Sequence, residues 1–164
     1  LGLCSRGEYA EIQLEQQTVP AAAMAQMNEV LLPGARILAC RQMEEKEPSI
    51  GGRIAQAEYT LYPETAADIR QALADFTALA EIVISKKTKK GMADVNVRPM
   101  IHQLFEQDGC IKATLSCSNS ENLRADTLAG LLREYLGIHI GQIWREKLFI
   151  MEGTSLKEPA EIGE

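Results

Sequence analysis

Five basic residues lie close together in the middle of the sequence and could contact phosphate groups. They are Lys86, Lys87, Lys89, Lys90 and Arg98. Lysine ammonium groups attract phosphate as mobile point charges, so such a cluster gives salt-sensitive affinity for a polyanion with little dependence on its sequence. Gly91 follows the last lysine and is typical of a loop tip. Structured RNA is therefore a reasonable ligand for this segment.

Other interpretations of the same segment stay open. Lysines on an exposed hairpin also prevent edge-to-edge pairing of strands, and a basic segment can dock on an acidic protein. Asp94 and Arg98 could pair locally and anchor the turn before Pro99. Alternatively, Asp94 and Arg98 could form the centre of a small RNA-acting enzyme, which would require a pocket and a carboxylate with a shifted pKa.

The remaining chemistry-bearing residues predict no catalytic centre, metal or cofactor. The four cysteines form no CxxC pair, and they are Cys4, Cys40, Cys110 and Cys117. We expect buried free thiols. His102 and Glu106 could share a helix face, but two ligands are too few for a metal site. No GxSxG motif and no glycine-rich phosphate loop occurs.

Aromatic residues could stack on nucleobases, as they do on RNA-binding sheets. The candidates are Tyr59, Tyr62, Tyr135 and Trp144. Aromatic residues make up only 5% of the chain, and none lies in a paired RNA-binding motif. We therefore expect these side chains to pack in the core.

The composition is that of a globular domain with a core. The 164 residues are 46% hydrophobic and 24% charged, which excludes a disordered chain and a large multidomain enzyme. The net charge of −6 means that nucleic acid or anionic lipid can bind only at a local patch. No apolar stretch is long enough to span a bilayer and no signal peptide is recognisable, so we predict a cytoplasmic protein.

The first part of the chain predicts a partial ferredoxin-like half-unit over residues 1–47. Apolar alternation predicts a strand at 8–15, three- and four-residue spacing predicts a helix at 20–31, and a short apolar run predicts a strand at 36–41. A polar stretch with proline and glycine follows, and we predict a linker at 48–55.

The second part predicts a ferredoxin-like unit over 56–151, followed by a flexible acidic tail at 152–164. Its expected elements are a strand near 57–61, a helix near 69–79, a strand near 82–84, an extended piece near 95–97, a short helix at 99–109, a strand at 111–115, a helix from 123 to 136 and a strand at 143–150. This order is typical of a βαββαβ unit with one inserted short helix. The predicted fold class is therefore α+β.

Several segments carry a family resemblance. They are Ser5-Arg6-Gly7-Glu8-Tyr9-Ala10-Glu11-Ile12-Gln13-Leu14, then Leu31-Leu32-Pro33-Gly34, Lys89-Lys90-Gly91 and Asp94-Val95-Asn96-Val97-Arg98-Pro99-Met100-Ile101. Together they resemble the DUF2344 family, also called radical SAM-associated or radical SAM-linked proteins, up to about residue 150. The resemblance marks Gly7, Glu8, Tyr9, Gly91, Asp94 and Pro99 as motif residues that we expect to be structural.

The resemblance implies a partner. Members of this family are similar to partners of, or fusions to, B12-binding radical SAM proteins, often in neighbourhoods concerned with ribosomes and RNA processing. Full members carry a further stretch before the Gly-Glu-Tyr segment, which implies that this sequence lacks its N-terminal portion. The CxxxCxxC motif of a radical SAM enzyme is absent, so this chain is not the catalytic half.

These observations predict a non-catalytic accessory module of a radical SAM system. It would bind RNA or a ribosome-related substrate, or the radical SAM partner, through the segment from Lys86 to Arg98. One alternative is the small enzyme centred on Asp94 and Arg98. The other is a purely structural protein–protein interaction module, in which another chain completes an open sheet edge.

Overall fold

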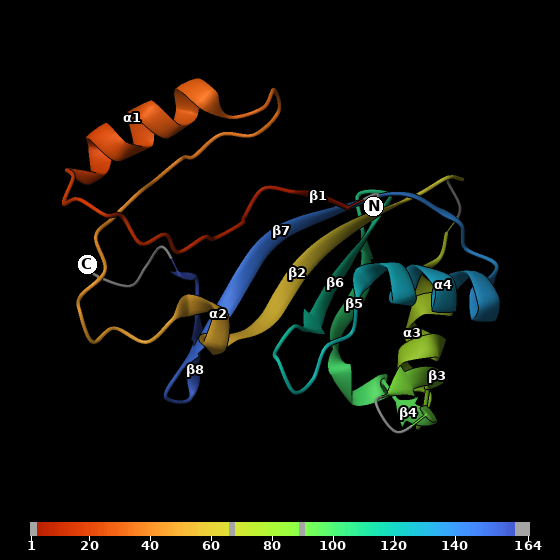
Figure 1. The fold of residues 1–164 in the computed structure, drawn as a ribbon. Helices are drawn as coiled ribbons and strands as arrows, with labels where there is room; N and C mark the ends of the chain where they lie inside the picture. The colour runs from red at the N-terminus through yellow and green to blue at the C-terminus, as the bar shows by residue number, and fades with distance from the viewer. Residues whose placement is uncertain (1–2, 66–67, 89–90, 160–164) are drawn as a thin grey trace. The chain divides into compact units, whose positions relative to one another are not determined.

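The computed structural model describes residues 3–65, 68–88 and 91–159 (Figure 1). The chain divides into two compact units. The larger comprises residues 1–9 together with 50–164, and the smaller comprises residues 10–49. Among the described residues, no helix is both long and apolar enough to cross a membrane. The fold class is α+β, as predicted.

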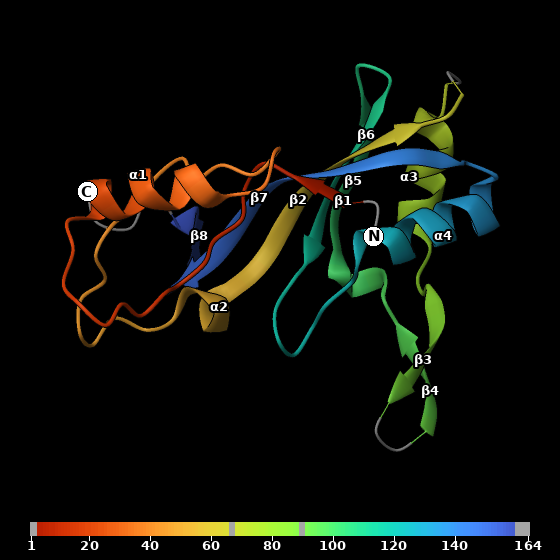
Figure 2. The same cartoon turned by 45° about the horizontal axis from the view of Figure 1, so that its top comes forward.

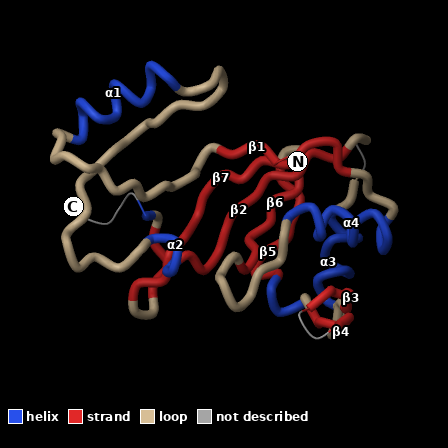
Figure 3. Tube along the Cα trace, viewed as in Figure 1, coloured by secondary structure: helices blue, strands red, loops and turns tan. Residues whose placement is uncertain are grey.

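A six-stranded mixed sheet forms the framework of the larger unit (Figure 3). Its strand order is β1-β7-β2-β6-β5, with β8 paired to β7, and every pair is antiparallel except the parallel β1 and β7. The strands are β1 (Leu3–Ser5), β2 (Ile54–Pro63), β5 (Ile101–Gln107), β6 (Cys110–Ser116), β7 (Ile140–Glu152) and β8 (Ser155–Lys157). The predicted strands near 57–61, 111–115 and 143–150 are confirmed as parts of β2, β6 and β7.

Two helices pack on one face of this sheet, α3 (Arg70–Ala78) and α4 (Ala125–Leu136) (Figure 2). Both were predicted from the spacing of apolar residues. Their buried residues join alternate residues of the strands in one core, which includes Leu73, Phe76, Leu128, Leu131 and Leu132 from the helices and Ala57, Tyr59, Leu61, Ile111, Ala113 and Leu115 from the sheet. A third, short helix, α2 (Ile50–Arg53), lies within the segment predicted as a linker.

A second, two-stranded sheet consists of β3 (Val83–Thr88) and β4 (Gly91–Asn96). These antiparallel strands form a hairpin that is inserted between α3 and β5. The strand predicted near 82–84 is confirmed and extends further than expected, and the short extended piece near 95–97 falls at the end of β4.

The predicted helix at 99–109 is wrong. A single 3₁₀ turn at Arg98–Met100 leads directly into strand β5. Ile101 and Leu104 both face the core although they are three residues apart, because the register shifts between Ile101 and Gln103. A bulge of this kind adds one residue to a strand, so it produces the three-residue apolar spacing of a helix.

The predicted strands at 8–15 and 36–41 are also wrong, so the partial βαβ half-unit does not form. Residues 10–49 are all described and contain no strand, only helix α1 (Pro20–Val30) where a helix was expected. Ile12 and Leu14 are more than half exposed. An alternating pattern forms a strand only where a neighbouring strand can pair with it and a core can bury its apolar face, and residues 10–49 have neither.

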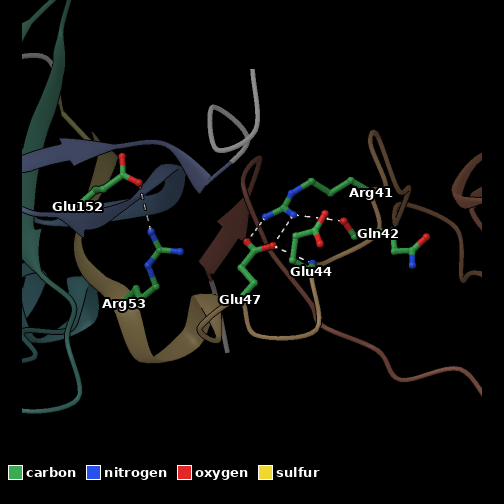
Figure 4. A network of polar contacts seen from close by, with 6 residues as sticks. All are labelled: Arg41, Gln42, Glu44, Glu47, Arg53 and Glu152. Carbon is green, nitrogen blue, oxygen red and sulfur yellow. Dashed lines mark hydrogen bonds and ion pairs between the residues drawn. The ribbon is translucent and has the colours of Figure 1, made fainter.

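Polar contacts organise the smaller unit instead of a sheet. The Asn28 side chain accepts a hydrogen bond from the Ile37 amide at 2.8 Å and donates one to the Ile37 carbonyl at 3.1 Å. Arg41 forms a bidentate ion pair with Glu47, with N···O distances of 2.8 and 2.5 Å (Figure 4). In the larger unit, Arg53 lies 3.8 Å from the Glu152 carboxylate, which is also drawn in Figure 4.

Candidate functional site

The base of the β3–β4 hairpin is fixed in the core of the larger unit. Ile82 and Val97 flank the two strands and are 0% and 2% exposed. The Val97 amide donates to the Ile82 carbonyl at 2.7 Å. The Asn96 side-chain oxygen accepts hydrogen bonds from the Ile82 amide at 3.1 Å and the Arg98 amide at 3.0 Å. These contacts hold both ends of the hairpin together.

Arg98 also holds this base in place. Its Nε donates to the Thr77 carbonyl at 2.7 Å, and a terminal guanidinium nitrogen donates to the Ile101 carbonyl at 3.1 Å. Thr77 lies in the last turn of α3, where carbonyl groups lack helical partners and a positive charge is favourable. Arg98 thus joins α3, the hairpin and β5, and the sequence-based pairing of Arg98 with Asp94 is replaced by these carbonyl contacts.

Lys86 and the backbone of Lys87 lie farther along the hairpin, on β3. Lys86 is exposed on β3, opposite Ala93, and the backbone of Lys87 lies opposite Met92. Lys89 and Lys90 lie outside the described residues. Asp94 lies opposite Ser85, and alternation along the strands places it on the other face of the hairpin from Lys86. The acidic residue of this segment therefore points away from Lys86.

A groove of about 550 Å³ separates the hairpin from α4. Its lining combines one strand residue with one face of the helix, namely Ile84, Thr127, Gly130, Leu131, Arg133 and Glu134. Lys86 shares the hairpin face of Ile84. A Cβ atom at Gly130 would meet nothing within 4 Å, so this glycine is not required by packing.

The motif residues fall into two places. Asp94 is exposed on β4, Pro99 lies in the 3₁₀ turn, and Gly91 begins β4 with φ of +121°. Neither Asp94 nor Arg98 is among the residues that line the groove. Asp94 therefore belongs to the hairpin and Arg98 to its base, and these two residues share no described cleft.

Gly7, Glu8 and Tyr9 lie beside β7. A Cβ atom on Gly7 would lie 3.1 Å from the Glu146 carbonyl oxygen, so this close approach of two backbones favours glycine. Glu8 forms an ion pair with Arg145, and Tyr9 packs against the core. These contacts fix the N-terminal segment along the strand.

A buried polar cluster lies next to this contact. Tyr59 is 4% exposed, and burial raises its pKa to about 12. Burial also raises the pKa of the Cys117 thiol, which makes it a poor nucleophile at neutral pH. Burial opposes the charge of Arg145, but the contact with Glu8 keeps the pKa of Arg145 above its ordinary value. The cluster has the character of a structural contact.

The other thiols and ionisable groups of the described chain form no further centre. All four cysteines are free, as predicted, but the expectation that they are buried is wrong, since Cys40 is exposed and Cys4, Cys110 and Cys117 are only partly buried. His102 lies on β5 and contacts the Ser116 hydroxyl at 2.9 Å. Glu106 accepts hydrogen bonds from Arg70 at 2.5 Å and the Gly109 amide at 2.7 Å, and these bonds lower its pKa. Within the described ranges, no three His, Cys, Asp or Glu side chains gather as metal ligands do.

The expectation that the aromatic residues pack in the core is confirmed only for Tyr59. Tyr135 is 47% exposed on α4 and contacts the edge of Phe76. Tyr62 and Trp144 are partly exposed and lie outside the core. Burial preference alone does not assign a face of a strand, since the register decides which side chains point toward the helices.

Comparison with known proteins adds a family. The family model DUF2344, described as an uncharacterized protein conserved in bacteria, matches residues 1–125. No curated protein and no solved structure matches the chain.

Proposed function

Starting from the fact that this chain belongs to the DUF2344 family, we propose that it is a non-catalytic accessory module that binds RNA through the β3–β4 hairpin. The lysines of the segment from Lys86 to Lys90 contact phosphates, and Arg98 positions the hairpin. The observation that carries this proposal is the placement of an exposed Lys86 on a hairpin whose base is fixed in the core.

Electrostatics supports the hairpin as the local phosphate-binding patch. The chain carries a net charge of −6, so long-range repulsion would keep a polyanion away from most of its surface. Four lysines within five residues reverse this sign locally. Because Asp94 is on the opposite face of the hairpin from Lys86, it does not neutralise that lysine. Exposed lysines also reach phosphate without a large desolvation cost.

The architecture supports a binding module. The strands β2, β5, β6 and β7 with α3 and α4 follow the order strand, helix, strand, strand, helix, strand, and their sheet order is β7-β2-β6-β5. We interpret this arrangement as ferredoxin-like, with the β3–β4 hairpin inserted before the second strand. We further propose, from the family resemblance alone, that the module acts in the cytoplasm beside a B12-binding radical SAM protein.

Fluorescence anisotropy with a labelled RNA stem-loop tests this function. A variant with Lys86, Lys87, Lys89 and Lys90 changed to Gln should bind at least ten-fold more weakly than the parent. The matched control changes four exposed cations elsewhere, Arg36, Arg70, Arg124 and Lys46, to Gln and loses the same charge. If both variants bind equally well, the hairpin is not the binding site. If the parent does not bind RNA but binds an acidic protein, the proposed ligand is wrong.

A further inference from the structure

The sheet face opposite α3 and α4 carries a row of side chains that the hairpin hypothesis does not use. Phe105 on β5 lies opposite Lys112 on β6, Lys112 lies opposite Thr60 on β2, and Thr60 lies opposite Trp144 on β7. Directly paired residues project from the same face of a sheet. The row therefore crosses four strands and places an aromatic ring at each end.

The aromatic side chains of this face remain accessible. Phe105 is 45% exposed, and Trp144 is partly exposed. Tyr62 is partly exposed two residues beyond Thr60 on β2, which places it on the same face. Strands are about 4.8 Å apart, so three strand spacings separate the Phe105 and Trp144 positions by roughly 14 Å.

A hydrogen-bonded network holds the charges between these rings. Lys112 Nζ donates to the Thr60 hydroxyl at 2.8 Å, and this hydroxyl donates to Glu146 Oε1 at 2.8 Å. Arg6 Nε lies 3.3 Å from Glu146 Oε2, and the Arg6 guanidinium lies 4.7 Å from the centre of the Trp144 ring. Thr60 is only 1% exposed, so its buried hydroxyl fixes the positions of the Lys112 and Glu146 side chains that it contacts.

The charge of this network favours an anionic ligand. Glu146 contacts both the Arg6 guanidinium and the Thr60 hydroxyl. Lys112 donates to the Thr60 hydroxyl and forms no ion pair with a described carboxylate. The Arg6 side chain is 61% exposed above Trp144. Lys112 suits a phosphate of the backbone, and Phe105 and the Arg6 guanidinium over Trp144 offer flat surfaces to the bases of a single-stranded nucleic acid, whose affinity comes from phosphate contacts and stacking.

We propose that this sheet face binds an unpaired segment of RNA, with one base stacked on Phe105, another stacked on the Arg6 guanidinium that covers Trp144, and with Lys112 contacting the sugar–phosphate backbone. This inference rests on the proposed RNA-binding function and specifies its substrate as RNA with a single-stranded region. A double helix cannot present its bases in this way, because they are stacked and paired within the duplex.

Intrinsic fluorescence tests the proposal directly, because Trp144 is the only tryptophan of the chain. The full chain is titrated with an unstructured single-stranded RNA of about ten nucleotides and, separately, with a duplex of the same sequence. The single strand should quench Trp144 emission to saturation, with the same Kd as a parallel anisotropy titration. The duplex should leave the emission unchanged.

Substitutions at Phe105 provide the second arm. Phe105→Ala should weaken single-strand binding by about 5- to 150-fold, the range for loss of one stacked base, while Phe105→Tyr should keep it near the parental value. Tyr135→Ala is the matched control, since Tyr135 is a similarly exposed aromatic residue on the helical side. Urea unfolding shows that each variant is folded before it is titrated.

The outcomes separate this proposal from the hairpin function. If RNA binds by anisotropy without changing Trp144 emission, or if Phe105→Ala binds as tightly as the parent, the sheet-face proposal is wrong and the hairpin function stands. If neither RNA binds, both proposals fail. If an uncharged peptide quenches Trp144 and the single strand does not, the face binds protein and the proposed ligand is overturned.

Discussion

The role of Arg98 leads to a prediction that separates a positioning residue from a phosphate ligand. The residue lies in the basic segment, yet its guanidinium donates to the Thr77 and Ile101 carbonyls at 2.7 and 3.1 Å. Arg98→Lys keeps the positive charge but cannot contact both carbonyls in the same way, because an ammonium group is a point charge without a planar fork. Arg98→Gln removes the charge as well.

The expected loss of stability follows from these two bonds. Hydrogen bonds that involve a charged group contribute about 1.5–3 kcal/mol each, and partial exposure lets water replace some of this. We expect Arg98→Gln to lower the free energy of unfolding by about 2–4 kcal/mol and Arg98→Lys to lower it by about 1–2 kcal/mol. For a chain of this size, each kcal/mol lowers Tm by about 2–4 °C.

Urea unfolding followed by circular dichroism measures the first effect, and hydrogen exchange locates it. Backbone amides of β3 and β4 should exchange faster in both variants, because the base of the hairpin is loosened. RNA affinity should fall in both variants, because both loosen the base of the hairpin, although neither removes a phosphate contact. An unfolding free energy of Arg98→Lys within about 0.5 kcal/mol of the parent, combined with weaker RNA binding by Arg98→Gln alone, would make Arg98 a ligand and refute the reasoning.

Three further predictions concern the larger unit. Gly130→Ala should stabilise the fold by about 0.5–1 kcal/mol in urea unfolding, because the added Cβ meets nothing, whereas Gly137→Ala should destabilise it by about 1–2 kcal/mol because Gly137 has φ of +69°; equal effects would contradict this. Thr60→Val should cost about 1–2 kcal/mol in the same assay, since the Lys112 and Glu146 side chains lose their common hydroxyl, and an unchanged unfolding midpoint would show that the bridge contributes nothing. The pKa of Tyr59 is raised to about 12 in the folded chain, whereas the same phenol ionises near pH 10 in the unfolded chain. The contribution of this raised pKa to the free energy of unfolding is therefore complete below pH 10 and is lost as the pH rises to about 12. Tyr59→Phe should remove this fall in stability between about pH 10 and 12.

The sequence predicted the elements in which periodicity and packing agree. Leu128, Leu131 and Leu132 recur at helical spacing and face the sheet, and Gly137 ends α4 in the left-handed conformation. Ile111, Ala113 and Leu115 alternate on β6 and are buried as expected. Here local pattern and tertiary environment specify the same structure.

Prediction failed where two different structures can produce the same local pattern of apolar residues. The apolar spacing of β5 is that of a helix because a bulge shifts the register after Ile101. The signal that could have revealed a hairpin is Asp108-Gly109, whose φ values of 54° and 77° fit the two-residue turn that joins β5 to β6. In residues 10–49 the alternating pattern lacks a partner strand, so it forms no sheet.

The candidate site was predictable only in part. A run of lysines identifies a basic segment but not the groups that it contacts, and the structure adds that Lys86 is exposed. Arg98 contacts Thr77, which lies 21 residues earlier in the chain, and Ile101, which was wrongly assigned to a helix. The spacing of residues could therefore not reveal these contacts. The position of Trp144 on the open face depends on strand register, which the sequence did not specify.

The salt dependence of RNA binding tests the central claim most directly. Each phosphate contact contributes roughly 0.7 to the slope of log K against log salt concentration for a single strand, so changing Lys86, Lys87, Lys89 and Lys90 to Gln should reduce the magnitude of the slope by up to about 3. The charge-matched variant at Arg36, Arg70, Arg124 and Lys46 should keep the parental slope. Parallel lines for the parent and the hairpin variant would contradict the account, because they would show that these lysines release no counterions when RNA binds.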